Sequence, residues 1–172
     1  RQVQDIEKLV NEFSSFARMP SPVFKKIEIS IIVKRAIDFY KLSSLNTISF
    51  RASEKKIKIN GDEEQLYRVF INLIKNSEES ILEKKLKNIN FKGKISIEIL
   101  DNNDYTTITQ IDNGVGIKDN VKIMTPYFTT KKEGTGLGLP IVSKIISEHL
   151  GDFVITDNKP GVKILITLPK IK

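Results

Sequence analysis

The stretch DNGVGI (residues 112–117) is followed farther along the chain by TTKKEGTGLGL (residues 129–139). Five of the nine glycines of the chain fall within these two segments. Glycine is favoured where the backbone takes a positive φ or where a ligand approaches closely, and it costs conformational entropy on folding. A bound polyanion is the simplest explanation for so many glycines. We therefore expect residues 112–139 to form a nucleotide pocket.

The first segment suits recognition of a base. Asp112 follows a predicted strand, and its carboxylate can accept a hydrogen bond from an exocyclic amine such as adenine N6. Gly114 and Gly116 would let the ring pass close to the backbone. A simple Asx turn at the end of a strand is the alternative for this motif taken alone.

The second segment suits recognition of phosphates. Gly134, Gly136 and Gly138 fall at G-x-G-x-G spacing just before a predicted helix. Backbone N–H groups and a helix N-terminus can then face phosphate oxygens. Leu139 stands where the dinucleotide-binding fingerprint needs a small residue, and the Gly-Lys-Ser/Thr of a P-loop is missing. Both of these familiar nucleotide folds are therefore disfavoured.

Composition narrows the class of protein. The chain of 172 residues fits one domain plus a small appendage, and 28 basic against 21 acidic residues give a net charge of +7. Basic and acidic residues are interleaved, the densest basic run (residues 83–87) is typical of a solvated helix end, and no nucleic-acid motif occurs, so we expect no nucleic-acid partner. Without cysteine there is neither a disulfide nor a thiolate metal site.

The ends of the chain suggest a fragment. No run of about eighteen apolar residues occurs, and the chain begins at Arg1 rather than Met, so any membrane span is expected upstream. Apolar residues spaced three and four apart over residues 1–17 predict a helix that ends at MPSP (residues 19–22). Alone it would expose an apolar seam, so we favour the end of a bundle or dimerisation helix over an ordinary amphipathic helix.

The remaining periodicity predicts alternating strands and helices. Ser30 is expected to cap a helix, and Asp62, followed by two glutamates, is expected to cap a longer one. The predicted order is strand 26–29, helix 31–42, strands 46–52 and 56–59 joined by a charged turn, helix 63–86, hairpin 95–99 with 105–111, helix 138–150, and hairpin 153–156 with 162–168.

The helix predicted over residues 63–86 carries two asparagines of interest. Its apolar stripe is expected to be buried and consists of Leu66, Val69, Phe70, Leu73, Ile74 and Ile81. Asn72 and Asn76 lie four apart beside this stripe and therefore share a face. Asparagine is a mediocre helix former, and a buried amide needs partners. Exposed helix asparagines are the alternative interpretation.

Four motifs together resemble a known family. NLIKNS (72–77), DNGVG (112–116), PYFTTK (126–131) and GTGLGL (134–139) resemble, in order, the N, G1, F and G2 boxes of the ATP-binding domain of sensor histidine kinases. The resemblance covers about residues 23–169. Residues 1–22, with EFSSFAR (12–18), resemble the end of the second dimerisation helix in nitrogen-regulation sensor kinases. Together these resemblances imply the end of a dimerisation helix and a linker over 1–22, and an ATP-binding catalytic domain over 23–172.

The resemblance implies an α/β (α+β) fold of the Bergerat type, a two-layer sandwich in which helices cover one face of a mixed sheet. It also implies bound ATP and Mg²⁺ under a flexible lid. By resemblance, Asn76 would coordinate Mg²⁺, Asp112 would bind the adenine amine, and Lys131 would neutralise the distal phosphates. The other nucleotide-binding positions are Asn72, Gly114, Gly116, Ile117, Thr130, Gly134, Thr135, Gly136, Leu137 and Gly138.

The implied activity is transfer of the ATP γ-phosphate to a histidine on a dimerisation domain outside this chain, with Asn76 and Lys131 as the catalytic residues. In hydrolytic relatives of the gyrase, heat-shock chaperone and mismatch-repair types, a glutamate activates water at the position of Asn72, and an amide cannot act as that base. His149, the only histidine, is predicted to be structural. The alternatives are a regulatory ATP-binding module without kinase activity and an anti-sigma-type serine kinase.

The implied partners are the protein's own dimerisation domain, within a homodimer, and a cognate response regulator. The implied location is a cytoplasmic domain, with any inner-membrane anchor outside this chain. The sequence departs from the family pattern in three places: Met124 and Tyr127 replace the usual aromatic residues of the F box, and Val162 stands where threonine is frequent. These departures bear on lid dynamics and affinity.

Overall fold

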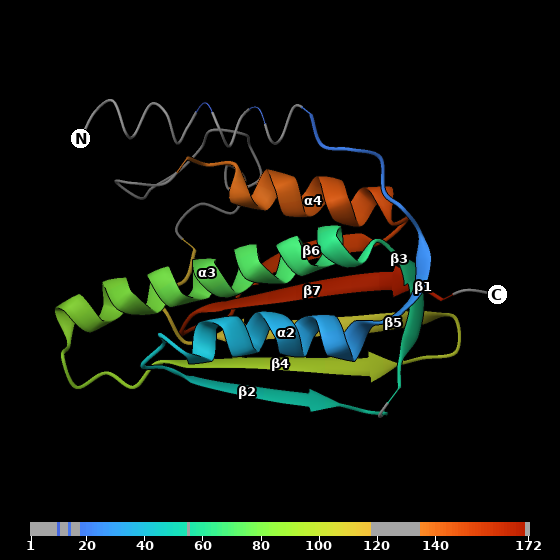
Figure 1. The fold of residues 1–172 in the computed structure, drawn as a ribbon. Helices are drawn as coiled ribbons and strands as arrows, with labels where there is room; N and C mark the ends of the chain where they lie inside the picture. Colours follow the sequence, from blue (N-terminus) through green and yellow to red (C-terminus); the bar gives the residue numbers. More distant parts are fainter. Residues whose placement is uncertain (1–9, 11–13, 15–17, 55, 118–134, 171–172) are drawn as a thin grey trace.

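The computed structural model describes residues 10, 14, 18–54, 56–117 and 135–170. The helix expected over residues 1–17 lies outside this part, apart from Val10 and Ser14, which are both helical. The elements, labelled in Figure 1, are β1 (Lys25–Glu28), α2 (Ile29–Lys41), β2 (Thr47–Ala52), β3 (Lys58–Gly61), α3 (Glu63–Lys87), β4 (Lys94–Asp101), β5 (Tyr105–Asp112), α4 (Gly138–Glu148), β6 (Asp152–Asp157) and β7 (Val162–Pro169).

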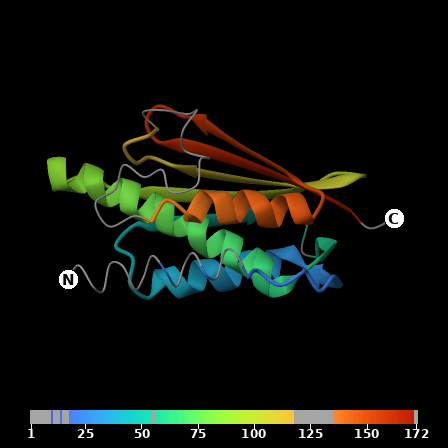
Figure 2. The ribbon, with the colours of Figure 1, turned by 90° about the horizontal axis from the view of Figure 1, so that it is seen from above.

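A mixed five-stranded sheet forms one layer. Its strand order is β2-β4-β5-β7-β6; β2 runs parallel to β4, and the other pairs are antiparallel. The three helices gather on one side of this sheet (Figure 2). β1 and β3 form a separate antiparallel pair. The predicted two-layer fold is therefore confirmed.

The core lies between this sheet and the buried faces of α2, α3 and α4. Alternate residues of β4 and β7 are buried, and the apolar stripe predicted for α3 is buried at all six positions. β5 follows the same alternation, with Thr106, Ile108, Gln110 and Asp112 buried. Because side chains alternate between the faces of a strand, these four residues share one face, and Gln110 and Asp112 on it bond to α3.

The predicted cap at Ser30 was wrong. The helix α2 already begins at Ile29, whose N–H donates to Ile57 O at 3.1 Å, so Ser30 lies inside the helix and is buried. The strands predicted at 46–52 and 56–59 are present as β2 and β3, and each pairs with a segment distant in the sequence: β2 with β4, and β3 with β1.

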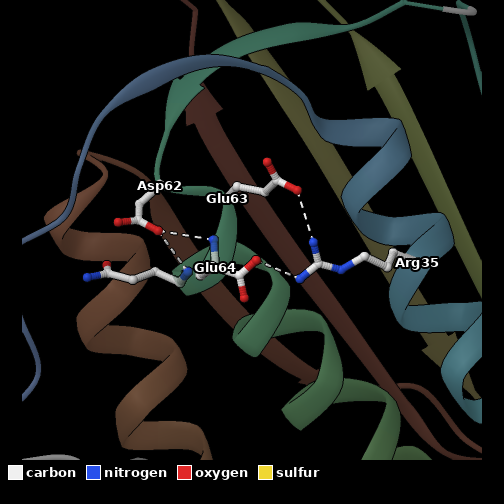
Figure 3. A network of polar contacts seen from close by, with 5 residues as sticks. Arg35, Asp62, Glu63 and Glu64 are labelled. Carbon is white, nitrogen blue, oxygen red and sulfur yellow. Dashed lines mark hydrogen bonds and ion pairs between the residues drawn. The ribbon is translucent and has the colours of Figure 1, made fainter.

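The start of α3 is a junction of several elements. The Asp62 carboxylate caps the helix by accepting from the N–H groups of Glu64 and Gln65, both at 3.0 Å, as predicted (Figure 3). Its second oxygen accepts from Val23 N at 2.8 Å. Asp62 N donates to His149 Nε2 at 2.9 Å, which ties the end of α4 to the start of α3. His149 is thus structural, as predicted.

Arg35 of α2 reinforces the same end of α3. Its guanidinium bonds to the carboxylates of Glu63 and Glu64 at 2.9 and 2.8 Å (Figure 3) and lies over the ring of Tyr67, 3.9 Å from its centroid. The glutamates are exposed, so each ion pair stabilises the fold only weakly.

None of the helices in the described ranges is both long enough and apolar enough to cross a bilayer.

Replacing Asp62 is expected to show how much this junction contributes. Burial alone would raise the pKa of Asp62, but the amides of Gln65, Val23 and Glu64 outweigh it and lower the pKa below its ordinary value. A lowered pKa stabilises the fold above the ordinary aspartate pKa of about 4, and the stabilisation is lost as the pH falls through the folded-state pKa. Asp62→Ala should lower the free energy of unfolding by about 1–2 kcal/mol at neutral pH and by less in acid.

Urea denaturation at pH 7 and near pH 3 measures this difference. Asp38→Ala is the matched control, because Asp38 makes only an exposed ion pair with Lys41 at 3.8 Å and should change stability little at either pH. An equal loss of stability for the two variants would contradict the role of the junction.

Candidate nucleotide-binding site

Asp112 stands at the centre of the candidate site. It ends β5 on the face turned toward α3 and is only 4% exposed. Its Oδ2 accepts from the hydroxyl of Ser77 at 2.8 Å, and its Oδ1 accepts from Gly114 N at 2.9 Å. The second bond is the Asx-type turn that the sequence offered as the alternative interpretation. The turn and a base-reading carboxylate are therefore compatible, because each oxygen can accept more than one hydrogen bond.

The environment of this carboxylate is unfavourable to its charge. Burial raises the pKa of Asp112, and the Gly114 amide, the Ser77 hydroxyl, the Val162 amide and the charge of Lys84 only partly offset the increase. A raised pKa contributes stability below the ordinary pKa and loses it as the pH rises. At neutral pH the ionised carboxylate therefore lowers stability, as is typical of a group kept for binding.

The turn after Asp112 is held from one side by α3. Ser80 Oγ accepts from Val115 N at 3.0 Å, and Lys84 Nζ donates to the carbonyls of Asn113 and Gly114 at 2.7 and 3.1 Å. A Cβ on Gly114 would collide with both the side chain and the backbone of Ser80. Only glycine fits this close approach, which explains the first glycine of the motif.

The other side of the turn is held by the sheet. Asn113 Oδ1 accepts from Lys94 N at 2.8 Å, and its Nδ2 donates to Lys92 O at 3.0 Å. Gly161, with φ +106°, packs against the backbone of Asp112 so closely that no side chain would fit. Gly116 has φ +78°. The turn that follows Asp112 (residues 113–116), called the base-side turn below, is consequently fixed in shape before any ligand binds.

The two predicted asparagines meet the start of α4. A Cβ on Gly138 would lie 3.5 Å from Asn72 Oδ1 and 3.9 Å from Asn76 Nδ2. The Nδ2 of Asn72 donates to Arg68 O at 2.9 Å, which leaves its carbonyl oxygen directed toward Gly138. Among the described residues no side chain caps the N-terminus of α4. The first N–H groups of a helix can donate to phosphate oxygens.

This asparagine pair fits a magnesium ion held mainly by phosphates. Mg²⁺ takes hard oxygen ligands, usually keeps several waters, and needs only one or two protein ligands beside substrate phosphates. The Asn76 amide, whose Nδ2 is its atom nearest to the Gly138 position at the start of α4, carries an oxygen of this kind. Within the described ranges no group of three His, Cys, Asp or Glu residues could hold a metal by itself.

The structure brings together most of the predicted site residues that it describes. Asn72 and Asn76 meet Gly138, while Ser77, the residue after Asn76, meets Asp112, so α3 links the start of α4 to the end of β5. Gly136, with φ +71°, and buried Leu137 lead into α4; Thr135 and Ile117 are partly buried. Thr130, Lys131 and Gly134, and the F-box departures Met124 and Tyr127, lie outside the described residues.

Four residues of the site were not predicted from the sequence. Ser77, Ser80 and Lys84 line one face of α3, and their spacings of three and four could have revealed it. The prediction of a solvated helix end was wrong for Lys84, whose ammonium reaches two carbonyls and lies 4.6 Å from the centroid of the Phe91 ring. Gln110, two residues before Asp112 on the same strand face, is also buried.

Comparison with known proteins is consistent with this site. Residues 61–172 match the family model described as histidine kinase-, DNA gyrase B- and HSP90-like ATPase. The chain is 36% identical over 154 residues to a putative NtrY-like sensor histidine kinase of Rickettsia felis, which covers 88% of this chain and 25% of that protein. It is 32% identical to the nitrogen regulation protein NtrY of Azorhizobium caulinodans over 94% of this chain and 21% of that protein. The chain thus spans about a quarter of such relatives.

Solved structures agree with the sequence relatives. The catalytic domain of histidine kinase ThkA superposes with a TM-score of 0.75 at 26% identity, over 86% of this chain and 96% of that domain. ThkA in complex with the response regulator protein TrrA gives a TM-score of 0.80 at 20% identity, over 99% of this chain and 48% of that one, which supports the fold. This chain belongs to the family of histidine kinase-, DNA gyrase B- and HSP90-like ATPases, and it is an ATP-binding domain of the kind found in sensor histidine kinases.

Proposed function

We propose that the chain binds Mg-ATP and transfers the γ-phosphate to a histidine of a dimerisation domain, as the catalytic domain of a sensor histidine kinase. The observation that carries the proposal is the arrangement along α3. One face of this helix bonds to the buried Asp112 carboxylate through Ser77, and the preceding turn presents Asn72 and Asn76 to the uncapped start of α4. The carboxylate proposed to bind adenine and the helix start proposed to bind phosphates therefore both contact α3.

At the base end, Asp112 would accept the adenine 6-amino group. A hydrogen bond to a charged acceptor contributes about 1.5–3 kcal/mol net, enough to select adenine over a purine that carries a carbonyl there. Gly114 and Gly116 belong to the turn that α3 and β7 hold in shape, so the ring would meet a preformed surface. Ile117, which follows the turn, is proposed to lie beside the base.

At the phosphate end, Gly134, Thr135, Gly136, Leu137 and Gly138 are proposed to wrap the phosphate chain at the start of α4. Lys131 is proposed to neutralise the distal phosphates, and Thr130 to be a further nucleotide-binding residue. Asn76 would coordinate Mg²⁺, with Asn72 beside it. The ion, when bound, spreads the negative charge of the phosphates during transfer. The assignments of Asn72, Asn76 and Gly138 rest on the meeting of Gly138 with both asparagines and on the ligand chemistry of amides. Those of Thr130, Lys131 and Gly134 rest on the family resemblance of their motifs.

The acceptor is proposed to lie outside this chain. Asn72 is an amide and cannot serve as the general base that activates water, so the site is better suited to transfer than to hydrolysis. His149 is buried, with its Nε2 accepting from Asp62 N and its Nδ1 against Ile145 O at 2.7 Å, so it is not a phosphate acceptor.

The flanking segment is proposed to connect to that acceptor domain. Pro20 O accepts from Gln65 Nε2 at 2.9 Å and Val23 N donates to Asp62, so the linker expected over 19–22 is anchored at the start of α3. We assign residues 1–22 to the end of a dimerisation helix and residues 23–172 to the catalytic domain. A homodimer, a cognate response regulator and a cytoplasmic position, with any membrane anchor elsewhere in the full protein, complete the proposal.

Incubating the chain with a separate histidine-bearing dimerisation domain and ATP labelled at the γ-phosphate tests the proposed transfer. We expect acid-labile, base-stable label on the histidine of that domain and none on this chain alone. Label on serine, or no label in the presence of a competent acceptor and Mg²⁺, would contradict the proposal. Asp112→Asn serves as the negative control in the same assay.

Asp112→Asn is expected to separate binding from stability. The amide cannot accept the adenine amine as a carboxylate does, so ATP affinity should fall about ten- to a hundred-fold. Because burial raises the pKa of Asp112, the ionised group lowers stability at neutral pH, and the variant should unfold at the same or a higher urea concentration. Titration with a fluorescent ATP analogue and urea unfolding measure the two effects; tight binding that survives the substitution would exclude the adenine assignment.

Asn72→Glu is expected to raise ATP hydrolysis in the absence of an acceptor, because it restores a carboxylate where hydrolytic relatives carry their base. Phosphate release is measured under saturating ATP, with binding measured separately. Asn72→Gln is the matched control, since it has the same length without a base and should not increase hydrolysis. Equal rates of ATP hydrolysis in Asn72→Glu and Asn72→Gln, with ATP binding intact, would contradict the inference that the amide at position 72 suppresses hydrolysis.

A further inference from the structure

We infer that Ser77 is a positioning residue that sets the preference for adenine, because its hydroxyl, oriented by Gln110, fixes the direction in which Asp112 can accept the 6-amino group. The inference rests on the proposed ATP binding and identifies a residue that governs its base selectivity. Ser77 would not need to touch the nucleotide, because its hydroxyl acts through its hydrogen bond to the Asp112 carboxylate.

Gln110 determines where the Ser77 proton points. Its Nε2 donates to Leu73 O and to Ser77 Oγ, both at 3.0 Å. Leu73 O can only accept, so the nitrogen of the amide must face it, and the same NH₂ group then also faces the serine oxygen. Since Ser77 Oγ accepts from Gln110, its own proton is directed to Asp112 Oδ2 at 2.8 Å. Ser77 is 2% exposed and Gln110 is 3% exposed, so solvent does not compete for this chain of bonds.

The bonds to Asp112 restrict where a further donor can approach. A carboxylate offers about four acceptor directions. Two of them are used, one on each oxygen, by the Ser77 hydroxyl and the Gly114 amide. Each oxygen keeps a direction that is defined by the bond it already accepts, and a ligand amine must approach along one of these two. Of the two donors, only Ser77 is a side chain, so only its bond can be removed by substitution without changing the backbone.

Ser80 provides a matched comparison within the same helix face. It is also a serine, three residues farther along α3, but its Oγ bonds to Val115 N at 3.0 Å rather than to the carboxylate. Loss of the Ser80 hydroxyl should loosen the turn and weaken every nucleotide alike. Loss of the Ser77 hydroxyl should weaken only those nucleotides whose amine bonds to Asp112.

The experiment compares two ligands across four variants of the whole chain. Dissociation constants are measured by calorimetry for Mg-ATP and for the Mg complex of purine riboside triphosphate, which has hydrogen in place of the 6-amino group. We expect wild type to prefer ATP by about ten-fold or more. Ser77→Ala should lose most of this preference by weakening ATP while leaving the analogue unchanged. Ser80→Ala should weaken both ligands by the same factor.

Two further substitutions make the test independent of folding. Ser77→Thr keeps the hydroxyl and should retain the preference, and Ser77→Cys keeps the volume but has only a weak donor, so it should lose the preference as Ser77→Ala does. Thermal unfolding establishes that each variant is folded. Equal weakening of both ligands in Ser77→Ala and Ser77→Cys would show a merely structural role and overturn the inference. A wild type without preference would instead refute the adenine assignment itself, before any variant is considered.

Discussion

The contact between the Asp112 carboxylate and α3 is the interaction on which the arrangement of the site depends. A buried carboxylate is unfavourable unless it accepts hydrogen bonds, and here the donors are Ser77 of α3 and the Gly114 amide of the turn. This contact requires small side chains on α3 and a glycine at position 114, since the helix and the turn approach too closely for a Cβ. The same helix face then carries Asn72 and Asn76 to α4, so one contact fixes both ends of the site relative to each other.

Both ends of α3 are anchored, which explains how a helix of 25 residues can act as the rigid element of the site. At its start, Asp62 joins the helix to the linker through Val23 and to α4 through His149. Near its end, Lys84 joins the helix to the carbonyls of the base-side turn. Displacement of the linker segment would therefore act, through these bonds, on the helix whose Ser77 hydrogen-bonds to Asp112.

The sequence predicted the features that depend on periodicity, and it did not predict those that depend on distant pairing. The apolar stripe of α3 and the β4–β5 hairpin follow from local patterns and are confirmed. The parallel pairing of β2 with β4 needs contacts across the whole α3 segment, which no local pattern encodes. Ser77 and Lys84 were missed because a serine on a helix and a lysine in a charged run usually indicate solvent; their roles arise only from what β5 places opposite them.

The raised pKa of Asp112 connects recognition with stability. Without a ligand, the ionised carboxylate has two fixed hydrogen-bond donors, Ser77 and Gly114, in a site that solvent scarcely reaches, and its charge lowers the stability of the fold at neutral pH. An adenine amine would supply a further donor and offset part of this destabilisation, so nucleotide binding should stabilise the turn and α3 as well as occupy the site. Because Gly114 donates through the backbone, its part of the geometry that receives the amine belongs to the fold itself, and Ser77 is the point at which a single side chain can adjust that geometry.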